Sequence, residues 1–279
     1  MIRRTEISTI AKLWGKPRKG QARILVLDIE TAPIAANVWR IWKENVGLNQ
    51  ITKDWYILSF AAKWLGEEKV RYFDQSKEPN IEDDTNLLAQ LHLLLSEADF
   101  IVAHNGRKFD LKKINARFIQ KGFSPPSPYR IIDTLEIAKA KFAFTSNRLA
   151  YISEQLNVDF KKLEHGKFPG FALWREVMTG NREAWKEMRL YNEYDVLSLE
   201  ETYLHMRAWD DRHPNVNVFN DTEEASACPI CGSHHLVLSG HSHTNTGKYP
   251  RFHCADCGAW SRGRYTVNTT EKRKALLSK

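Results

Sequence analysis

An apolar run that ends in two acids constrains the fold of this chain more than any other feature. Residues 23–30 read RILVLDIE, and a run of leucine and β-branched residues predicts a buried central strand. Asp28 and Glu30 are two positions apart, so both side chains project from the same face of that strand. Buried carboxylates are costly unless they are paired or hold a metal. The strand therefore predicts a divalent-metal site with oxygen ligands.

The segments that follow alternate between strand and helix patterns. Strands are predicted for YILSFAAKWL, KVRYFD, DFIVAHN and YRIIDT, at residues 56–65, 69–74, 99–105 and 129–134. Helices are predicted over about 82–97, 111–123, 133–141, 147–157 and 181–208. Strands first, then alternating strand and helix, indicate an α/β fold in which helices flank a mixed sheet.

Two further acidic motifs accompany the first. HNGRKFD places Asp110 just beyond a predicted strand, where a helix begins. YNEYD places Tyr191 and Asp195 four positions apart on a predicted helix, and therefore on one face of it. Carboxylates gathered at one edge of a sheet can hold two hard cations about 4 Å apart. Such a pair clamps a phosphodiester, because one ion generates hydroxide and the other stabilises the leaving oxygen.

These three motifs, in this order, resemble those of the DEDD superfamily of 3′–5′ exonucleases, which has a ribonuclease H-like fold. The tyrosine in YNEYD is typical of the DEDDy branch. DIET together with Asn105-x-x-x-Phe109-Asp110 is similar to the proofreading domains of family B DNA polymerases. The resemblance covers roughly residues 22–208. It implies a metal-dependent exonuclease that releases nucleoside 5′-monophosphates from 3′ ends.

The resemblance also implies which residues would hold two Mg²⁺ or Mn²⁺ ions. Asp28 would bridge both ions, and Glu30 and Asp195 would complete the protein ligands of the hydrolytic one. Asp110 would hold the second ion, directly or through water. A helix N-cap is the competing role for Asp110, because aspartate favours that position.

Three further residues are implied to act on the substrate. Tyr191 would hydrogen-bond the attacking water, while its usual pKa near 10 leaves the formation of hydroxide to the metal. Asn105 and Phe109 would contact and stack on the 3′-terminal nucleotides. Packing in the core is the alternative for Tyr191 and Phe109.

Neighbouring residues that could be mistaken for site residues are predicted to be structural. His104 is expected to be a structural hydrogen bonder, and Asp133 in IIDTLEIAK is also assigned to structure. Trp39, Trp42 and Trp55 could line a nucleic-acid groove, but core or lid packing is the expected role of each.

A cysteine motif predicts a second, small domain. Cys228-x-x-Cys231 and Cys254-x-x-Cys257 are separated by 22 residues and would form the closed tetrahedral site of a structural zinc ribbon. Iron–sulfur ligation and a redox dithiol are the alternatives. The chain has no other cysteine, which favours a reducing compartment. A module of about 40 residues has too small a core to fold alone, so zinc would supply folding free energy.

The same module combines basic and aromatic residues. They are Lys248, Tyr249, Arg251, Phe252, Trp260, Arg262, Arg264 and Tyr265. This composition resembles a nucleic-acid-binding face, with protein docking as the competing role. The histidines of the module are assigned to polar loops, because four cysteines suffice for zinc.

The net charge of +7 is unevenly distributed. Residues 1–23 and 227–279 each carry about +6, and the segment between them about −5. An acidic domain flanked by basic ends suits a polyanionic substrate, although basic ends can also serve only solubility. The predicted divisions are a basic N-terminal arm (1–22), an exonuclease domain (23–209), a linker (210–226), a four-cysteine zinc ribbon (227–265) and a basic tail (266–279).

The sequence also bears on location and partners. It lacks both an apolar stretch of roughly 20 residues and the apolar core of a secretory signal, so a cytoplasmic protein without membrane contact is expected. The expected partner is single-stranded DNA with a free 3′ end, and a replication or repair protein could dock on the ribbon. Exoribonuclease, structure-specific endonuclease and non-catalytic nucleic-acid binder are the alternatives. A lysine or arginine filling the gap between the carboxylates would leave only a zinc-bearing nucleic-acid binder.

Overall fold

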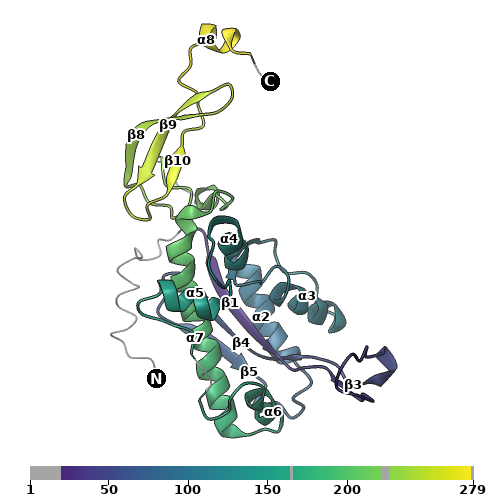
Figure 1. Cartoon of the computed structure of the whole chain (residues 1–279). Coiled ribbons are helices and arrows are strands. Elements are labelled where there is room, and N and C mark those ends of the chain that lie inside the picture. The colour runs from purple at the N-terminus through teal and green to yellow at the C-terminus, as the bar shows by residue number, and fades with distance from the viewer. Residues whose placement is uncertain (1–19, 164–165, 221–225, 278–279) are drawn as a thin grey trace.

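The computed structural model describes residues 20–163, 166–220 and 226–277 (Figure 1). The predicted N-terminal arm therefore lies almost wholly outside the described residues. A five-stranded mixed sheet forms the larger part of the molecule. Its order is β5 (Val70–Asp74), β4 (Ile57–Trp64), β1 (Ile24–Thr31), β6 (Phe100–Ala103) and β7 (Arg130–Asp133). The central strand β1 runs antiparallel to β4 and parallel to β6, which confirms the predicted α/β fold with a mixed sheet.

Helices cover both faces of this sheet (Figure 1). They are α2 (Thr85–Glu97), α3 (Asp110–Gln120), α4 (Thr134–Lys141), α5 (Leu149–Leu156), α6 (Ala172–Met178) and α7 (Arg182–Met206). Leu25, Leu27 and Ile29 of β1 pack with α2 and α3 in one core cluster. Ile24 and Val26 pack with α4, α5 and α7 in another. Every second residue of β1 therefore faces α7, as strand geometry requires.

The predicted strands and helices match the observed ones to within a few residues at each end. Apart from short 3-10 helices such as η1 (Leu48–Gln50), four short elements of the described residues were not predicted: α6, the strands β2 (Ala35–Ala36) and β3 (Ile51–Lys53) that form a small ribbon, and α8 (Thr270–Ala275). Each has at most seven residues, too few for a periodic pattern to emerge. None of the described helices is long and apolar enough to cross a membrane.

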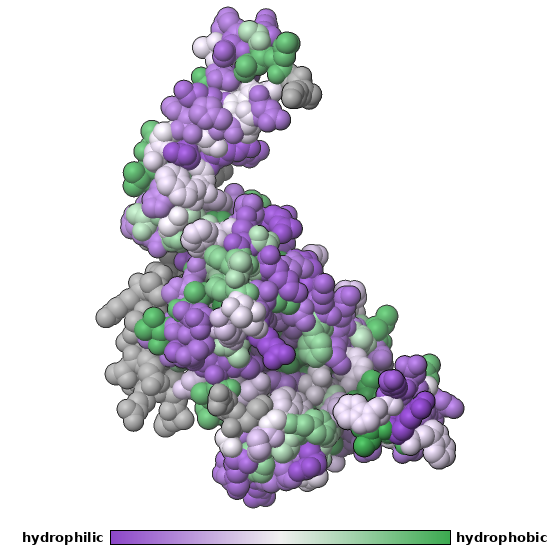
Figure 2. Space-filling view, in the orientation of Figure 1, coloured by the Kyte–Doolittle hydropathy of each residue, from purple (hydrophilic) through white to green (hydrophobic). Residues whose placement is uncertain are grey.

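The segment between β2 and β3 exposes its hydrophobic side chains. Trp39 is 93% exposed and Trp42 81% exposed, so neither packs in the core, and of the expected core or lid packing only the lid role stays a prediction. Figure 2 shows hydrophobic residues on this segment, the projecting arm of residues 37–50 between β2 and β3. Trp55, at the base of the arm, is partly buried and lies under the Lys113 ammonium, 3.7 Å from the ring centre.

The cysteine-bearing segment forms a separate three-stranded sheet beyond the end of α7 (Figure 1). Its strands β8 (Leu236–His243), β9 (Lys248–Cys254) and β10 (Trp260–Arg262) pair in the order β10-β9-β8. A small cluster that includes the four cysteines packs against Ala208, in the 3-10 helix η2 (Arg207–Trp209) that continues α7. The polar segment predicted as a linker contributes the 3-10 helix η3 (Val216–Phe219), whose Asn217 side chain donates to Cys228 O at 3.0 Å.

Candidate active site

Asp28 and Glu30 lie on the face of β1 that is turned towards α7. Asn192 of α7 donates from Nδ2 to Asp28 Oδ2 at 2.6 Å. Asn192 is fully buried, and Ser59 of β4 donates to its Oδ1 at 3.3 Å. This chain of hydrogen bonds fixes the orientation of the Asp28 carboxylate. Sequence reasoning missed Asn192, although its place directly after Tyr191, on the inward side of the same helix, was a usable signal.

The strand and the helix bring three carboxylates together. Asp28, Glu30 and Asp195 each offer an oxygen, and these oxygens lie within 4.8 Å of one another. Asp195 is almost completely buried, whereas Asp28 and Glu30 are partly exposed. Carboxylates at this spacing repel one another, and hard divalent cations are the ions that such an oxygen set fits.

Asp110 reaches the backbone of β1 between its two acids. Its Oδ1 accepts a hydrogen bond of 3.3 Å from the backbone N–H of Ile29, the residue between the two acids of the strand. Asp110 is the first residue of α3, and Phe109 holds the cap position, so a role as the N-cap is wrong. The preceding loop needs Gly106, because a Cβ there would lie 2.3 Å from the Ala103 Cβ.

The electrostatics of the cluster favour the binding of positive charge. Burial, followed by the charges of Asp195 and neighbouring acids, raises the pKa of Asp28 well above its ordinary value. Burial and then Asp195 raise the pKa of Glu30 to about 8. Burial raises the pKa of Asp110 to about 6. At neutral pH Glu30 therefore tends to keep a proton that a bound cation would displace.

A lysine that sequence reasoning did not single out also reaches the cluster. Lys162 Nζ lies 2.6 Å from Asp195 Oδ2 and 4.6 Å from the centre of the Tyr191 ring. Burial alone would lower the pKa of Lys162, but Asp195, Tyr191 and Asp28 together raise it. Burial and then the charge of Asp195 each raise the pKa values of Asp28 and Glu30 by more than Lys162 lowers them.

Tyr191 lies beside the carboxylates rather than in the core. It is partly exposed, and burial followed by the charge of Asp195 raises its pKa to about 12. Its ring meets that of Trp174 edge to face, with centres 6.1 Å apart. The Trp174 side chain also hydrogen-bonds Glu30. Trp174 lies on α6, so this short helix supplies a residue to the site that the sequence did not reveal.

The residues expected to hold the end of the substrate lie in the loop between β6 and α3. Asn105 adopts a left-handed backbone conformation with φ of 65°. Phe109 is 41% exposed, so it is not a core residue. Lys113, one turn into α3, lies 5.3 Å from the centre of the Phe109 ring and closer still to Trp55. These contacts leave a partly exposed aromatic ring next to Asp110.

His104 and Asp133 are structural, as the sequence predicted. The two ring nitrogens of His104 hydrogen-bond Thr134 Oγ1 and Asn147 O, each at 2.9 Å. Asp133 accepts hydrogen bonds from the backbone N–H groups of Asn105, at 2.9 Å, and Arg107, at 3.1 Å. These bonds hold the loop that carries Asp110.

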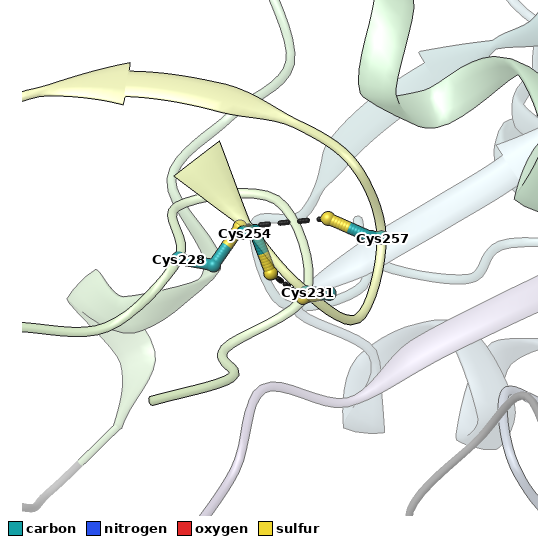
Figure 3. Close-up of side chains that lie close together, drawn as sticks. All are labelled: Cys228, Cys231, Cys254 and Cys257. Atoms are coloured by element: carbon teal, nitrogen blue, oxygen red, sulfur yellow. Dashed lines mark hydrogen bonds between the residues drawn. The ribbon is translucent and has the colours of Figure 1, made fainter. Parts of the chain in front are cut away.

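The four cysteines converge at the base of the ribbon (Figure 3). Cys228 Sγ lies 3.6 Å from Cys257 Sγ, and Cys231 Sγ lies 3.7 Å from Cys254 Sγ. All four sulfurs lie within 4.8 Å of one another, which is a donor set that fits a closed tetrahedral zinc site.

The comparisons with known proteins agree with this architecture. A family model described as RNase_H superfamily matches residues 43–207. The chain belongs to the RNase H superfamily. The ribonuclease H-like fold that the motifs implied is thereby confirmed. The matched region includes Asp110 and Asp195, whereas Asp28 and Glu30 precede it.

Two polymerases are similar to parts of the chain. It is 25% identical over 203 residues to the PolC-type DNA polymerase III of Ureaplasma parvum serovar 3, a match that covers 64% of this chain and 12% of that protein. The chain thus spans only a small part of the length of this relative. The structure of the family B DNA polymerase from Pyrobaculum calidifontis aligns over 70% of this chain and 26% of that one, with a TM-score of 0.47 and 16% identity.

Proposed function

We propose that this protein is a metal-dependent 3′–5′ exonuclease that removes nucleoside 5′-monophosphates from single-stranded DNA. The observation that carries the proposal is the convergence of Asp28, Glu30 and Asp195, with oxygens within 4.8 Å of one another. Asp110 joins them against the same strand. Membership of the RNase H superfamily and similarity to a DNA polymerase support a nuclease acting on DNA.

The residues of the site fit a pair of Mg²⁺ or Mn²⁺ ions, because they offer hard oxygen donors whose pKa values are raised by burial and then by neighbouring acidic charge. When bound, such ions activate water and stabilise the leaving oxygen of the phosphodiester. Asp28, Glu30 and Asp195 would hold the hydrolytic ion, and Asp110 the second. Asn192 keeps Asp28 oriented for this task.

Other residues of the site would bind and orient the substrate. Tyr191 would hydrogen-bond the attacking water through its hydroxyl group, and its raised pKa keeps that group protonated. Phe109 would stack on the 3′-terminal base, and Asn105 would contact the same nucleotide. We assign this chemistry to residues 23–209. The ribbon, residues 227–265, would hold one structural zinc ion through its four cysteines and add affinity for nucleic acid.

A single strand labelled at its 5′ end tests the proposal directly. With Mg²⁺ or Mn²⁺, the full chain should shorten the labelled strand one nucleotide at a time. Asp28→Asn should slow this reaction on the order of 10³-fold, equivalent to about 4 kcal/mol at the transition state. Asp83→Asn is the matched control, because Asp83 is half exposed and pairs with Lys121 at 2.7 Å. Equal rates for both variants would refute the assignment.

The contact of Lys162 with Asp195 favours a second candidate, a non-catalytic nucleic-acid-binding protein in which the ammonium replaces a metal. Retained DNA binding without any nucleotide release, in either Mg²⁺ or Mn²⁺, would establish it. Internal fragments would instead indicate an endonuclease. Faster shortening of an RNA strand of the same sequence would indicate an exoribonuclease.

A further inference from the structure

The ribbon sheet gathers basic and aromatic side chains on one of its two faces. In the ladder of β9 and β10, Trp260 lies opposite His253, and Arg262 lies opposite Arg251. Because side chains alternate along a strand, Tyr249 shares the face of Arg251 and His253. We call these five residues the stacking face: Tyr249, Arg251, His253, Trp260 and Arg262. Lys248 and Phe252 belong to the other face, so the set suggested by sequence alone is divided by the register.

Contacts within the stacking face hold its rings and guanidinium groups in layers. The Arg251 guanidinium lies 4.8 Å from the centre of the Trp260 ring, and that of Arg262 lies 4.5 Å from the Tyr249 ring. The His253 and Trp260 rings have centres 4.7 Å apart. Trp260 nevertheless remains 55% exposed. The face is therefore an ordered set of flat groups that is open to solvent.

The stacking face carries uncompensated positive charge. The ion pairs of the described residues include none for Arg251 or Arg262; Arg251 instead donates to Ser239 O at 2.9 Å. The nearest acid in the sequence, Asp256, is hydrogen-bonded to Ser233 and His235. Arg262 also lines a hollow with Tyr249, Gly263 and Arg264. Exposed rings between unpaired guanidinium groups suit bases joined by phosphates.

The position of the ribbon determines how such a strand could reach the carboxylates. The ribbon packs on Ala208, just past the end of α7 at Met206. Asp195 lies eleven residues before that end, and a helix rises 1.5 Å per residue, so the separation along α7 is about 17 Å. At ~3.4 Å per stacked nucleotide, a strand that touches both places needs about five nucleotides or more.

We propose that the stacking face binds the bases of a single strand upstream of the 3′ end that occupies the carboxylate site. The proposal rests on the proposed function for the placement of the 3′ end. A duplex would offer phosphates to the guanidinium groups, but its paired bases would not be free to stack on the rings. The face is therefore selective for unpaired nucleic acid and for strands long enough to span both sites.

Fluorescence anisotropy with labelled oligothymidines of 4 and 20 nucleotides tests this inference on the zinc-loaded full chain without added divalent ions. The 20-mer should bind the wild type at least tenfold more tightly than the 4-mer and than a 20-base-pair duplex. Trp260→Ala and the double variant Arg251→Gln/Arg262→Gln should each weaken 20-mer binding about tenfold and weaken 4-mer binding by a smaller factor. Trp260→Phe should retain most of the affinity.

The control removes the same charge from another surface. Lys272→Gln/Arg273→Gln changes two exposed residues of α8 and should alter 20-mer binding at most twofold. A measured zinc content of one per chain shows that each variant ribbon is folded. Unchanged 20-mer binding in zinc-loaded Trp260→Ala would overturn the proposal, as would an equal loss in the α8 control. In either case the stacking face would not be a nucleic-acid site, and a protein partner would be the remaining candidate for it.

The nuclease assay separates this inference from the proposed function. Length-dependent binding through Trp260 without release of nucleotides would overturn the exonuclease and keep the stacking face. Release of nucleotides with equal affinity for both lengths would keep the exonuclease and overturn the stacking face.

Discussion

Replacement of Lys162 by methionine tests the balance of charge in the carboxylate cluster. Lys162 Nζ lies 2.6 Å from Asp195 Oδ2, and its charge lowers the raised pKa values of Asp28 and Glu30. Lys162→Met keeps much of the side-chain volume but removes this charge. In the metal-free protein, the acids would then repel one another without compensation. A bound divalent cation would restore the compensation.

The size of the effect follows from the burial of the pair. Breaking a fully buried ion pair costs about 3–5 kcal/mol. The Lys162 side chain is 23% exposed, and Glu30, with its pKa of about 8, can take up a proton, so we expect about 2 kcal/mol. For a domain of this size that loss lowers the Tm by about 4–8 °C. Because Lys162 and Mg²⁺ are both positively charged, removal of the ammonium group should also tighten Mg²⁺ binding by about tenfold, or ~1.4 kcal/mol.

The assay compares thermal unfolding of wild type and Lys162→Met at pH 8, first without divalent ions and then with saturating Mg²⁺. Lys161→Met is the control, because Lys161 is half exposed and pairs with Glu154 at 2.8 Å. The Tm gap of Lys162→Met should close when Mg²⁺ is added, while Lys161→Met should differ little from wild type throughout. A gap that Mg²⁺ leaves unchanged would show that Lys162 contributes packing only, and would refute this account of the cluster.

Three further outcomes follow from the same structure. Burial raises the pKa of Glu30 to about 8, so the folded metal-free protein binds more protons than the unfolded chain. Its stability should therefore fall as pH rises from about 4.5 through 8. Denaturant titrations at several pH values measure this decline. Mg²⁺ should weaken that decline; an unchanged slope would contradict a metal site at these acids. Asn192→Ala should lower the rate of nucleotide release about 10–100-fold, because Asp28 loses the bond that orients it, while Ser59→Ala should have a smaller effect in the same assay. Cys231→Ser should release zinc and expose residues 226–277 to proteolysis, whereas the sheet around β1 should retain its Tm; simultaneous unfolding of both parts would show that they are coupled.

The strands and acidic motifs could be predicted because each depends on local sequence. The apolar run before Asp28 predicts a strand that is buried on both faces, and therefore one in the centre of a sheet. The four-residue spacing of Tyr191 and Asp195 places both on one helix face. Lys162 could not be found in this way, because it lies in a stretch without helix or strand and reaches the cluster through the fold alone. Trp174 escaped for a similar reason, since α6 has only seven residues.

Hydrophobic residues on the surface were the other source of error. Trp39 and Trp42 were expected to pack, because large apolar side chains are usually buried. Hydrophobicity indicates that a side chain seeks a partner, but not that the partner belongs to the same chain. In the ribbon, composition revealed a basic and aromatic module, whereas only the pairing of Trp260 with His253 showed which residues share a face.

Anomalous diffraction from crystals soaked in Mn²⁺ tests the central claim most directly, that the acidic side chains converge to bind catalytic divalent ions. The account predicts two peaks about 4 Å apart, one among Asp28, Glu30 and Asp195 and one nearer Asp110. It also predicts that Lys162 Nζ moves away from Asp195 Oδ2. Crystals that bind no Mn²⁺ at these residues, and in which Lys162 still contacts Asp195, would contradict it.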